Sequence, residues 1–191
     1  MTLSLPVGDD ANALLSRSPL ALLIGMLLDQ QVTIEKAFSS PAVLAERLGH
    51  EPEVTELAGF DSEALAAVFA ERPALHRYPR AMATRVQDLC RLIVERYHGD
   101  PERIWSGVKT GAELVKRVAG LPGFGQQKAQ IFVALLGKQL GVRPRGWREA
   151  AGPFGDRAAY RSVADIVDAE SLARVRAYKQ QLKAAAKAAV G

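Results

Sequence analysis

The segment best suited to chemistry is a glycine-lined turn between two apolar helical runs. Its residues, in order, are Leu121, Pro122, Gly123, Phe124, Gly125, Gln126, Gln127, Lys128 and Ala129. Proline fixes φ and lacks an N–H donor, whereas glycine adds backbone freedom and no side chain. This pattern predicts a tight hairpin whose second helix begins near Gly125. The unpaired N–H groups of that helix would bind an anion such as a DNA phosphate.

An ordinary Pro-Gly turn between two packed helices could contain the same residues. Two features favour the anion site. Lys128 lies one turn into the second helix, and no acidic residue occurs between Leu114 and Glu149. The surroundings of the turn are therefore positively charged, as a phosphate site requires.

Three stretches resemble, in order and spacing, the helix-hairpin-helix/Gly-Pro-Asp (HhH-GPD, endonuclease III-like) DNA glycosylases of base excision repair. They are the turn at 121–129, the apolar run at 19–33, and the helical segment at 77–99. Together they cover most of residues 19–140. The resemblance implies an all-α, two-lobed fold in a single domain, 1–191. Its parts would be the hairpin motif 112–137, a basic loop 138–155 and C-terminal helices 156–191.

Hydrophobic spacing also indicates the all-α class, because every long segment has helical periodicity and none alternates as a strand does. The residues 137–155 contain many glycines and prolines and are expected to be irregular. Thr33 and Ser40-Pro41 are expected to begin two separate short helices. Other helix starts are expected at Asp9 or Asp10, Ser18-Pro19, Asp61, Tyr78-Pro79 and Thr110.

Composition sets limits on partners and cofactors. The chain has 191 residues, 48% of them hydrophobic and 24% charged, as in ordinary globular proteins. Residues 1–100 carry 14 acidic and 9 basic side chains, whereas 101–191 carry 7 acidic and 16 basic. The positive half is where a polyanion would be held. Cys90 is the single cysteine, which excludes an intramolecular disulfide and a Cys-ligated iron–sulfur cluster.

The same survey gives expectations about location. The three histidines have no ligand spacing, so no zinc site is expected. No apolar run is long enough to span a bilayer, and the N-terminus lacks the basic region of a signal peptide. We therefore expect a cytoplasmic protein that is not bound to membranes. The resemblance implies double-stranded DNA as its partner and association with the nucleoid, and a monomer is expected because a single hairpin can hold the DNA.

Two further segments could contact DNA. The run at 19–28 ends abruptly in polar residues, and by resemblance Gln31, with Gln30 beside it, would enter the duplex and fill the gap left by an extruded base. The alternative is solvent-exposed polar filler. In the basic loop, Arg143, Arg145 and Trp147 could contact phosphates and stack on bases. The alternative is a surface loop with Trp147 packed against the core.

Cleavage of an N-glycosidic bond passes through an oxocarbenium-like sugar, which a nearby carboxylate stabilises. By resemblance that carboxylate would follow the hairpin, but the usual Val-Asp-x-His segment is missing and residues 143–148 are basic. The best substitute is Asp156, with Glu149 in reserve. Asp156 could equally be an ordinary helix N-cap.

The resemblance also concerns the amine nucleophile and a cation. The lyase lysine of bifunctional relatives corresponds to Gln127, which cannot form a Schiff base, so no strand-nicking activity is expected. Lys128 is expected to contact phosphate. A Na⁺ or K⁺ ion would bind the main-chain carbonyls of Ala119, Leu121 and Phe124. The expected function is a monofunctional DNA glycosylase. The alternatives are a catalytically silent DNA-binding protein and a helical scaffold that never meets DNA.

Overall fold

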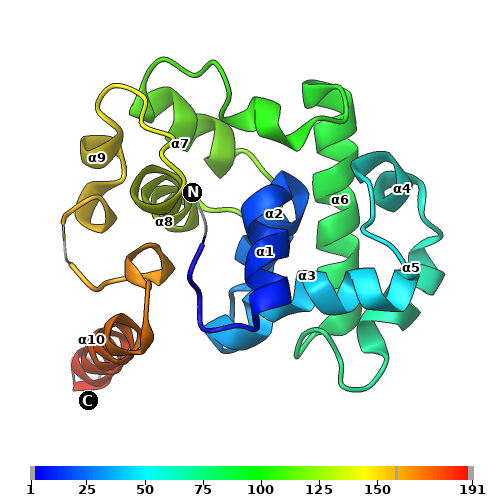
Figure 1. The fold of residues 1–191 in the computed structure, drawn as a ribbon, viewed down its shortest axis with the longest axis horizontal. Helices are drawn as coiled ribbons and strands as arrows, with labels where there is room; N and C mark the ends of the chain where they lie inside the picture. The colour runs from blue at the N-terminus through cyan, green and yellow to red at the C-terminus, as the bar shows by residue number, and fades with distance from the viewer. Residues whose placement is uncertain (1–2, 158, 189–191) are drawn as a thin grey trace.

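The computed structural model describes residues 3–157 and 159–188, which form an array of helices (Figure 1). Within these residues there is no strand, only an isolated bridge between Thr110 and Arg145, so the all-α class is confirmed. The α-helices are α1 (Asp9–Arg17), α2 (Pro19–Leu28), α3 (Ile34–Leu48), α4 (Val54–Gly59), α5 (Ser62–Ala70), α6 (Pro79–Tyr97), α7 (Gly111–Ala119), α8 (Gln126–Gln139), α9 (Trp147–Ala150) and α10 (Ala169–Ala188). Short 3₁₀ turns are η1 (Pro101–Ile104), η2 (Gly152–Phe154) and η3 (Val163–Asp165).

Helix α2 lies at the centre of the first group of helices, α1 to α6. Its residues 20–28 are all buried, because it is apolar on every side. The hydroxyl of Ser18 accepts the N–H of Ala21, and Pro19 occupies the first helical position. Helix α2 packs against α1 and α3, whereas α6 packs against α4 and α5. No single described helix is long and apolar enough to cross a membrane. Helices α1 and α2 reach that length only together, and the chain bends by 114° between them.

The expectation of two short helices after Thr33 was wrong, because α3 is one continuous helix that contains Pro41. The predicted cap is present: the Thr33 hydroxyl accepts the N–H of Lys36. The Ser40 hydroxyl donates to the carbonyls of Lys36 (2.7 Å) and Leu75 (2.9 Å). These bonds fix Ser40 inside the helix, so Ser40-Pro41 continues the helix instead of starting one.

The second group contains α7, α8 and α9, packed around the aromatic core of α8. Phe132 of α8 meets Trp105 and Phe124 edge-to-face, with ring centroids 5.8 and 6.0 Å apart. The residues 137–155 are more ordered than expected, because α8 runs on to Gln139 and the segment contains both α9 and η2. Helix α10 packs on η3 and then runs along one edge of the molecule.

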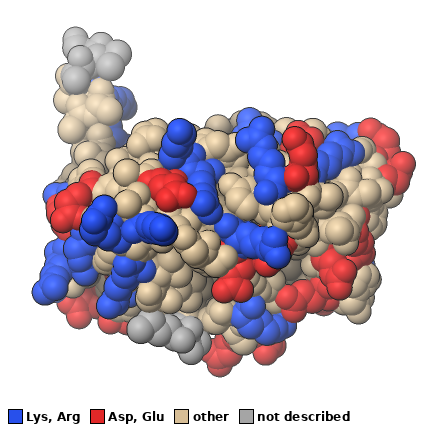
Figure 2. All heavy atoms as spheres, turned by 90° about the horizontal axis from the view of Figure 1, so that it is seen from above, with Lys and Arg blue, Asp and Glu red and all other residues tan. Residues whose placement is uncertain are grey.

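Charge is unevenly distributed over the surface. Figure 2 shows Lys and Arg side chains gathered over the left and centre of one face, whereas Asp and Glu lie mainly along its right and lower edges. The left side of that view holds α8 to α10, and the right side holds α4 and α5 (Figure 1). The asymmetry counted in the sequence is therefore also an asymmetry in space.

Candidate functional site

The hairpin between α7 and α8 is open to solvent, and its glycines are needed for that shape. Gly123 has φ +80°, and a Cβ there would lie 3.1 Å from Cγ of Leu27. Gly125 precedes α8 in an extended conformation, with no atom within 4 Å of the position a Cβ would take. No side chain caps α8, and Gln126 and Gln127 are exposed. The first-turn N–H groups of α8 are therefore free to meet an anion.

A cavity of about 770 Å³ lies directly beside this hairpin. Its walls come from the end of α2 and the loop that follows it, from Arg77 just before α6, from the first two turns of α8, and from α10. Met26, Val32 and Ile131 supply apolar surface. The polar wall consists of Asp29, Gln30, Gln31, Thr33, Arg77, Gln127, Lys128, Lys179 and Lys183. Among the described residues that line it, Asp29 is the one carboxylate.

Asp29 and Lys128 both line this cavity, and each affects the pKa of the other. Burial lowers the pKa of Lys128 to about 8, although the Asp29 carboxylate opposes the shift. Burial likewise raises the pKa of Asp29, although Lys179 and Lys128 oppose it. The Lys128 ammonium donates to the Leu27 carbonyl (3.0 Å) at the C-terminal end of α2, where the helix dipole favours a cation. The two groups therefore titrate closer to neutrality than free side chains do, as is common in active sites.

The loop after Asp29 is held by three hydrogen bonds that Gln30 forms with His76, Leu27 and Arg85. The Tyr78 N–H donates to Nδ1 of His76 (3.0 Å), so Nε2 carries the hydrogen and donates to the Gln30 carbonyl (2.8 Å). The Gln30 amide donates to the Leu27 carbonyl (2.9 Å) and accepts from Arg85 (3.0 Å). The Gln30 side chain is therefore held in this loop by hydrogen bonds.

Gln31, by contrast, is exposed and has φ +56°, an uncommon conformation for a residue other than glycine. Such strain persists only where the surrounding structure enforces it, and it concentrates at functional sites. Of the two glutamines, Gln31 is the one that is free to leave the surface.

A comparison with models of protein families assigns the chain to one family. A family model described as HhH-GPD superfamily base excision DNA repair protein matches residues 24–190. The chain belongs to the HhH-GPD superfamily. The match covers the loop at Asp29, the hairpin, the residues that line the cavity and the whole of α10. A search of curated proteins and a search of solved structures each found no match.

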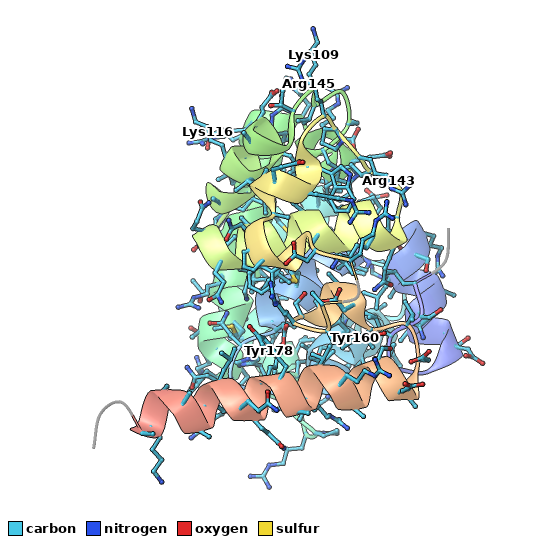
Figure 3. All side chains as sticks on the ribbon, turned by 90° about the vertical axis from the view of Figure 1, so that its left-hand side faces the viewer. Lys109, Lys116, Arg143, Arg145, Tyr160 and Tyr178 are labelled. Atoms are coloured by element: carbon cyan, nitrogen blue, oxygen red, sulfur yellow. The ribbon has the colours of Figure 1, made fainter. Side chains whose placement is uncertain are left out.

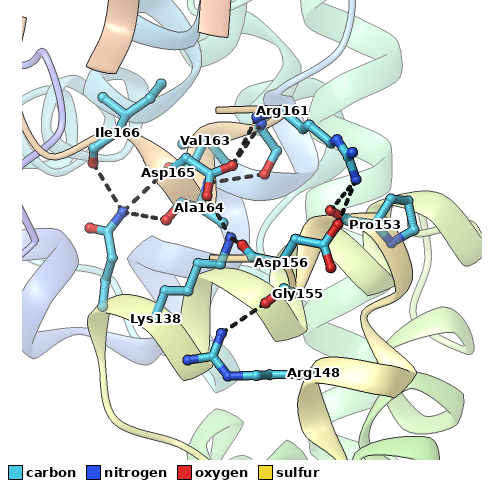
Figure 4. Close-up of polar contacts among 12 residues, drawn as sticks. Lys138, Arg148, Pro153, Gly155, Asp156, Arg161, Val163, Ala164, Asp165 and Ile166 are labelled. Carbon is cyan, nitrogen blue, oxygen red and sulfur yellow. Dashed lines mark hydrogen bonds and ion pairs between the residues drawn. The ribbon is translucent and has the colours of Figure 1, made fainter. Parts of the chain in front are cut away.

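Superfamily membership indicates a role in base excision DNA repair, and proteins of this superfamily act on DNA. The structure does not bring Asp156 into the cavity. The Asp156 side chain is 61% exposed and pairs with Arg161 (2.9 Å) (Figure 4). Its carbonyl accepts from Lys138 (2.7 Å), near the far end of α8. Lys138 lies ten residues beyond Lys128, about 15 Å along the helix. Asp156 is not a helix N-cap either, because η3 is capped by Ser162.

The basic loop likewise lies away from the cavity. Trp147 is buried, and a Cβ at Gly137 would lie 2.4 Å from its ring, so Trp147 is a core residue and does not present a face for stacking. Arg143 donates to the Gly137 carbonyl (2.8 Å) near the C-terminal end of α8, and Arg145 lies at the top edge in Figure 3. Glu149, on α9, is exposed and lines no part of the cavity.

Sequence reasoning gave no role to Asp29 or to the lysines of α10. Asp29 ends the most apolar helix of the chain, and a carboxylate in that position is an unusual neighbour for a core segment. That placement was the available signal. The lysines of α10 gave none, because their spacing is also that of an ordinary solvated helix face.

Proposed function

We propose that this protein is a DNA glycosylase that extrudes a damaged or mismatched nucleotide from double-stranded DNA and hydrolyses its N-glycosidic bond. Superfamily membership supports the role in base excision repair. The observation that carries the finer proposal is the position of Asp29. It is the carboxylate of a cavity large enough for a nucleoside, placed directly beside an uncapped hairpin.

The hairpin holds the DNA backbone in this proposal. The N–H groups at the start of α8 bind a phosphate without reading sequence, and the exposed Gln126 and Gln127 flank it. Gln31 enters the duplex in place of the extruded base, because its amide can donate to and accept from the orphaned partner. Gln30 keeps the loop in place through Arg85. The extruded nucleotide then lies in the cavity against Met26 and Ile131.

Asp29 stabilises the reacting sugar. As the N-glycosidic bond breaks, its electron pair leaves with the base, which takes up a proton, and positive charge develops at the sugar. The Asp29 carboxylate stabilises that charge and accepts a proton from the water that adds to the sugar carbon. Lys128 and Lys179 favour the ionised form of Asp29. Because the reaction needs that form, its rate falls as the pH drops through the raised pKa of Asp29.

The hairpin carbonyls also fit the Na⁺ or K⁺ ion that the superfamily resemblance implies. The Leu121 carbonyl accepts the N–H of Phe124 (3.0 Å). Within the described part of the chain, the carbonyls of Ala119 and Phe124 accept no backbone hydrogen bond outside the helices. Carbonyl oxygens of this kind are suitable ligands for a monovalent cation. Bound there, the cation would supply positive charge beside the phosphate site.

A second activity is favoured by one observation. Gln127 occupies the position of the lyase lysine, which supports a monofunctional enzyme. The next residue, Lys128, lines the cavity, and burial lowers the pKa of its amine to about 8. A desolvated lysine of this kind can attack an aldehyde to form a Schiff base. Borohydride reduction in the presence of abasic-site DNA would trap that adduct in the wild type and not in Lys128→Met.

The decisive experiment measures base release from duplexes that carry uracil, an oxidised purine, an alkylated purine or a mismatch, with alkaline cleavage of the abasic product. The proposal expects release from at least one duplex. Asp29→Asn should abolish it, whereas the exposed control Asp156→Asn should retain it. If only Asp156→Asn lost activity, Asp156 and not Asp29 would be the catalytic carboxylate. Tight DNA binding without release from any duplex would instead support the catalytically silent DNA-binding protein.

A further inference from the structure

Helix α10 changes character halfway along its length. In its first two turns, Ser171, Leu172 and Val175 are buried, and the helix packs on η3. From Gln180 to Ala188 every described residue is exposed. Figure 3 shows α10 along the lower edge of the molecule, with its C-terminal end extending beyond the other helices. Packing against the protein therefore accounts for the first half of α10 but not for the second.

The face that α10 turns toward the protein becomes cationic at that point. A rotation of about 100° per residue places Lys179 and Lys183 on the same side as Leu172 and Val175. A surface helix ordinarily continues its apolar stripe along this side. Here the stripe is replaced by two lysines that line the cavity. Lys187 continues the same row one turn farther out and is exposed. We call Lys179, Lys183 and Lys187 the lysine row.

The lysine row faces a space with an excess of positive charge. Arg77 and Lys128 line the same cavity, where Asp29 is the one carboxylate among the described residues. Within the described chain, neither Lys179 nor Lys183 forms an ion pair within 4 Å. Several like charges around one cavity repel each other unless an anion lies between them. In the free protein, Asp29 therefore offsets only part of the positive charge that lines this cavity.

We propose that the lysine row is a second DNA-binding element, which binds successive phosphates of the strand whose nucleotide enters the cavity. It rests on the proposed function, because it takes DNA as the occupant. Successive lysines of the row are separated by about 6 Å along the helix axis, so they can follow an extended backbone. Arg176 pairs with Glu35 at the start of α3, which ties α10 across the loop that carries Gln31. The DNA strand would thus be held between the hairpin and α10.

The salt dependence of binding to an undamaged duplex tests this proposal. Each phosphate that a lysine neutralises contributes about 0.9 to the slope of log Kobs against log salt. Lys179→Ala/Lys183→Ala should therefore reduce the slope by about 1.8. Alanine favours helices, and neither lysine forms an ion pair, so the melting temperature should not change. The matched control is Lys109→Ala/Arg145→Ala, which removes the same charge at the opposite edge of the molecule (Figure 3).

An unchanged slope in the α10 variant would overturn the proposal, as would an equal reduction in the control. Because the duplex is undamaged, the result does not depend on base release. If the wild type releases no base but the slope falls by about 1.8 in the α10 variant, the lysine row is supported and the glycosylase proposal fails. If the wild type releases a base but the slope is unchanged in the α10 variant, the glycosylase proposal is supported and the lysine row is refuted.

Discussion

Gly125 offers the sharpest test of the hairpin, because one substitution should stabilise the fold and weaken DNA binding. Its backbone, with φ −95° and ψ −179°, already suits an N-cap, and a side chain there would meet no atom within 4 Å. Gly125→Asp should therefore accept a first-turn N–H of α8. Compared with glycine at an N-cap, that raises the free energy of unfolding by only a few tenths of a kcal/mol.

The same carboxylate would repel the bound phosphate. At a separation of about 5 Å the repulsion is about 0.8 kcal/mol for an effective dielectric of 80 and about 3.3 kcal/mol for 20. These energies correspond to a Kd that is weaker by about 4-fold to about 270-fold. Gly125→Asn is the matched control, because it caps the helix in the same way without the charge. The ratio of the two Kd values therefore isolates the electrostatic effect.

Fluorescence anisotropy with a labelled duplex at one fixed low salt concentration gives both Kd values, and urea unfolding gives both stabilities. We expect the Asp variant to bind more weakly than the Asn variant by the factor above, and both to be at least as stable as the wild type. Equal Kd values for two stable variants would show that no phosphate lies at the start of α8, and the reasoning about the hairpin would be refuted.

Three other outcomes follow from single residues. Gln31→Ala should bind undamaged duplex like the wild type. Its rate of base release in single turnover should be about 5- to 30-fold lower, which corresponds to about 1–2 kcal/mol of lost transition-state stabilisation. An unchanged rate would exclude the insertion of Gln31 into the duplex. Gly137→Ala should lower the free energy of unfolding by about 1–3 kcal/mol, since its Cβ would lie 2.4 Å from the Trp147 ring; an unchanged urea midpoint contradicts that packing. The pKa of Lys128 is about 8, whereas an unfolded lysine titrates near about 10.4. Between these values the unfolded state binds more protons, so wild-type stability should rise with pH relative to Lys128→Met, and parallel profiles would show otherwise.

The fold was readable from the sequence wherever local chemistry decides the structure. Ser18-Pro19 and Thr110 begin helices as predicted, because the capping bond is made within three residues. The hairpin is equally local, since Gly123 needs its positive φ and Gly125 its free surface. The prediction that Ser40-Pro41 begins a helix was wrong because the Ser40 hydroxyl also donates to the Leu75 carbonyl, 35 residues away in sequence.

The candidate site was harder to predict because tertiary packing decides which polar residues meet. Burial raises the pKa of Asp29, and Lys128, which opposes that shift, is held by a hydrogen bond to Leu27, 101 residues away in sequence. No local sequence pattern encodes such a contact. Asp156 matched the sequence expectation for a catalytic carboxylate, yet its partner is Arg161 at the surface. Trp147 is an aromatic residue in a basic loop, which suggests base stacking, but its ring packs against Gly137.

Backbone amide NMR during titration with a duplex tests most directly the claim that DNA is held at the hairpin with one nucleotide in the adjoining cavity. The account predicts that the largest shifts fall in two segments, 123–128 at the hairpin and 29–33 at the loop after α2. The basic segment 143–148 should change little. Shifts concentrated in 143–148, with the hairpin and the Asp29 loop unaffected, would contradict the account.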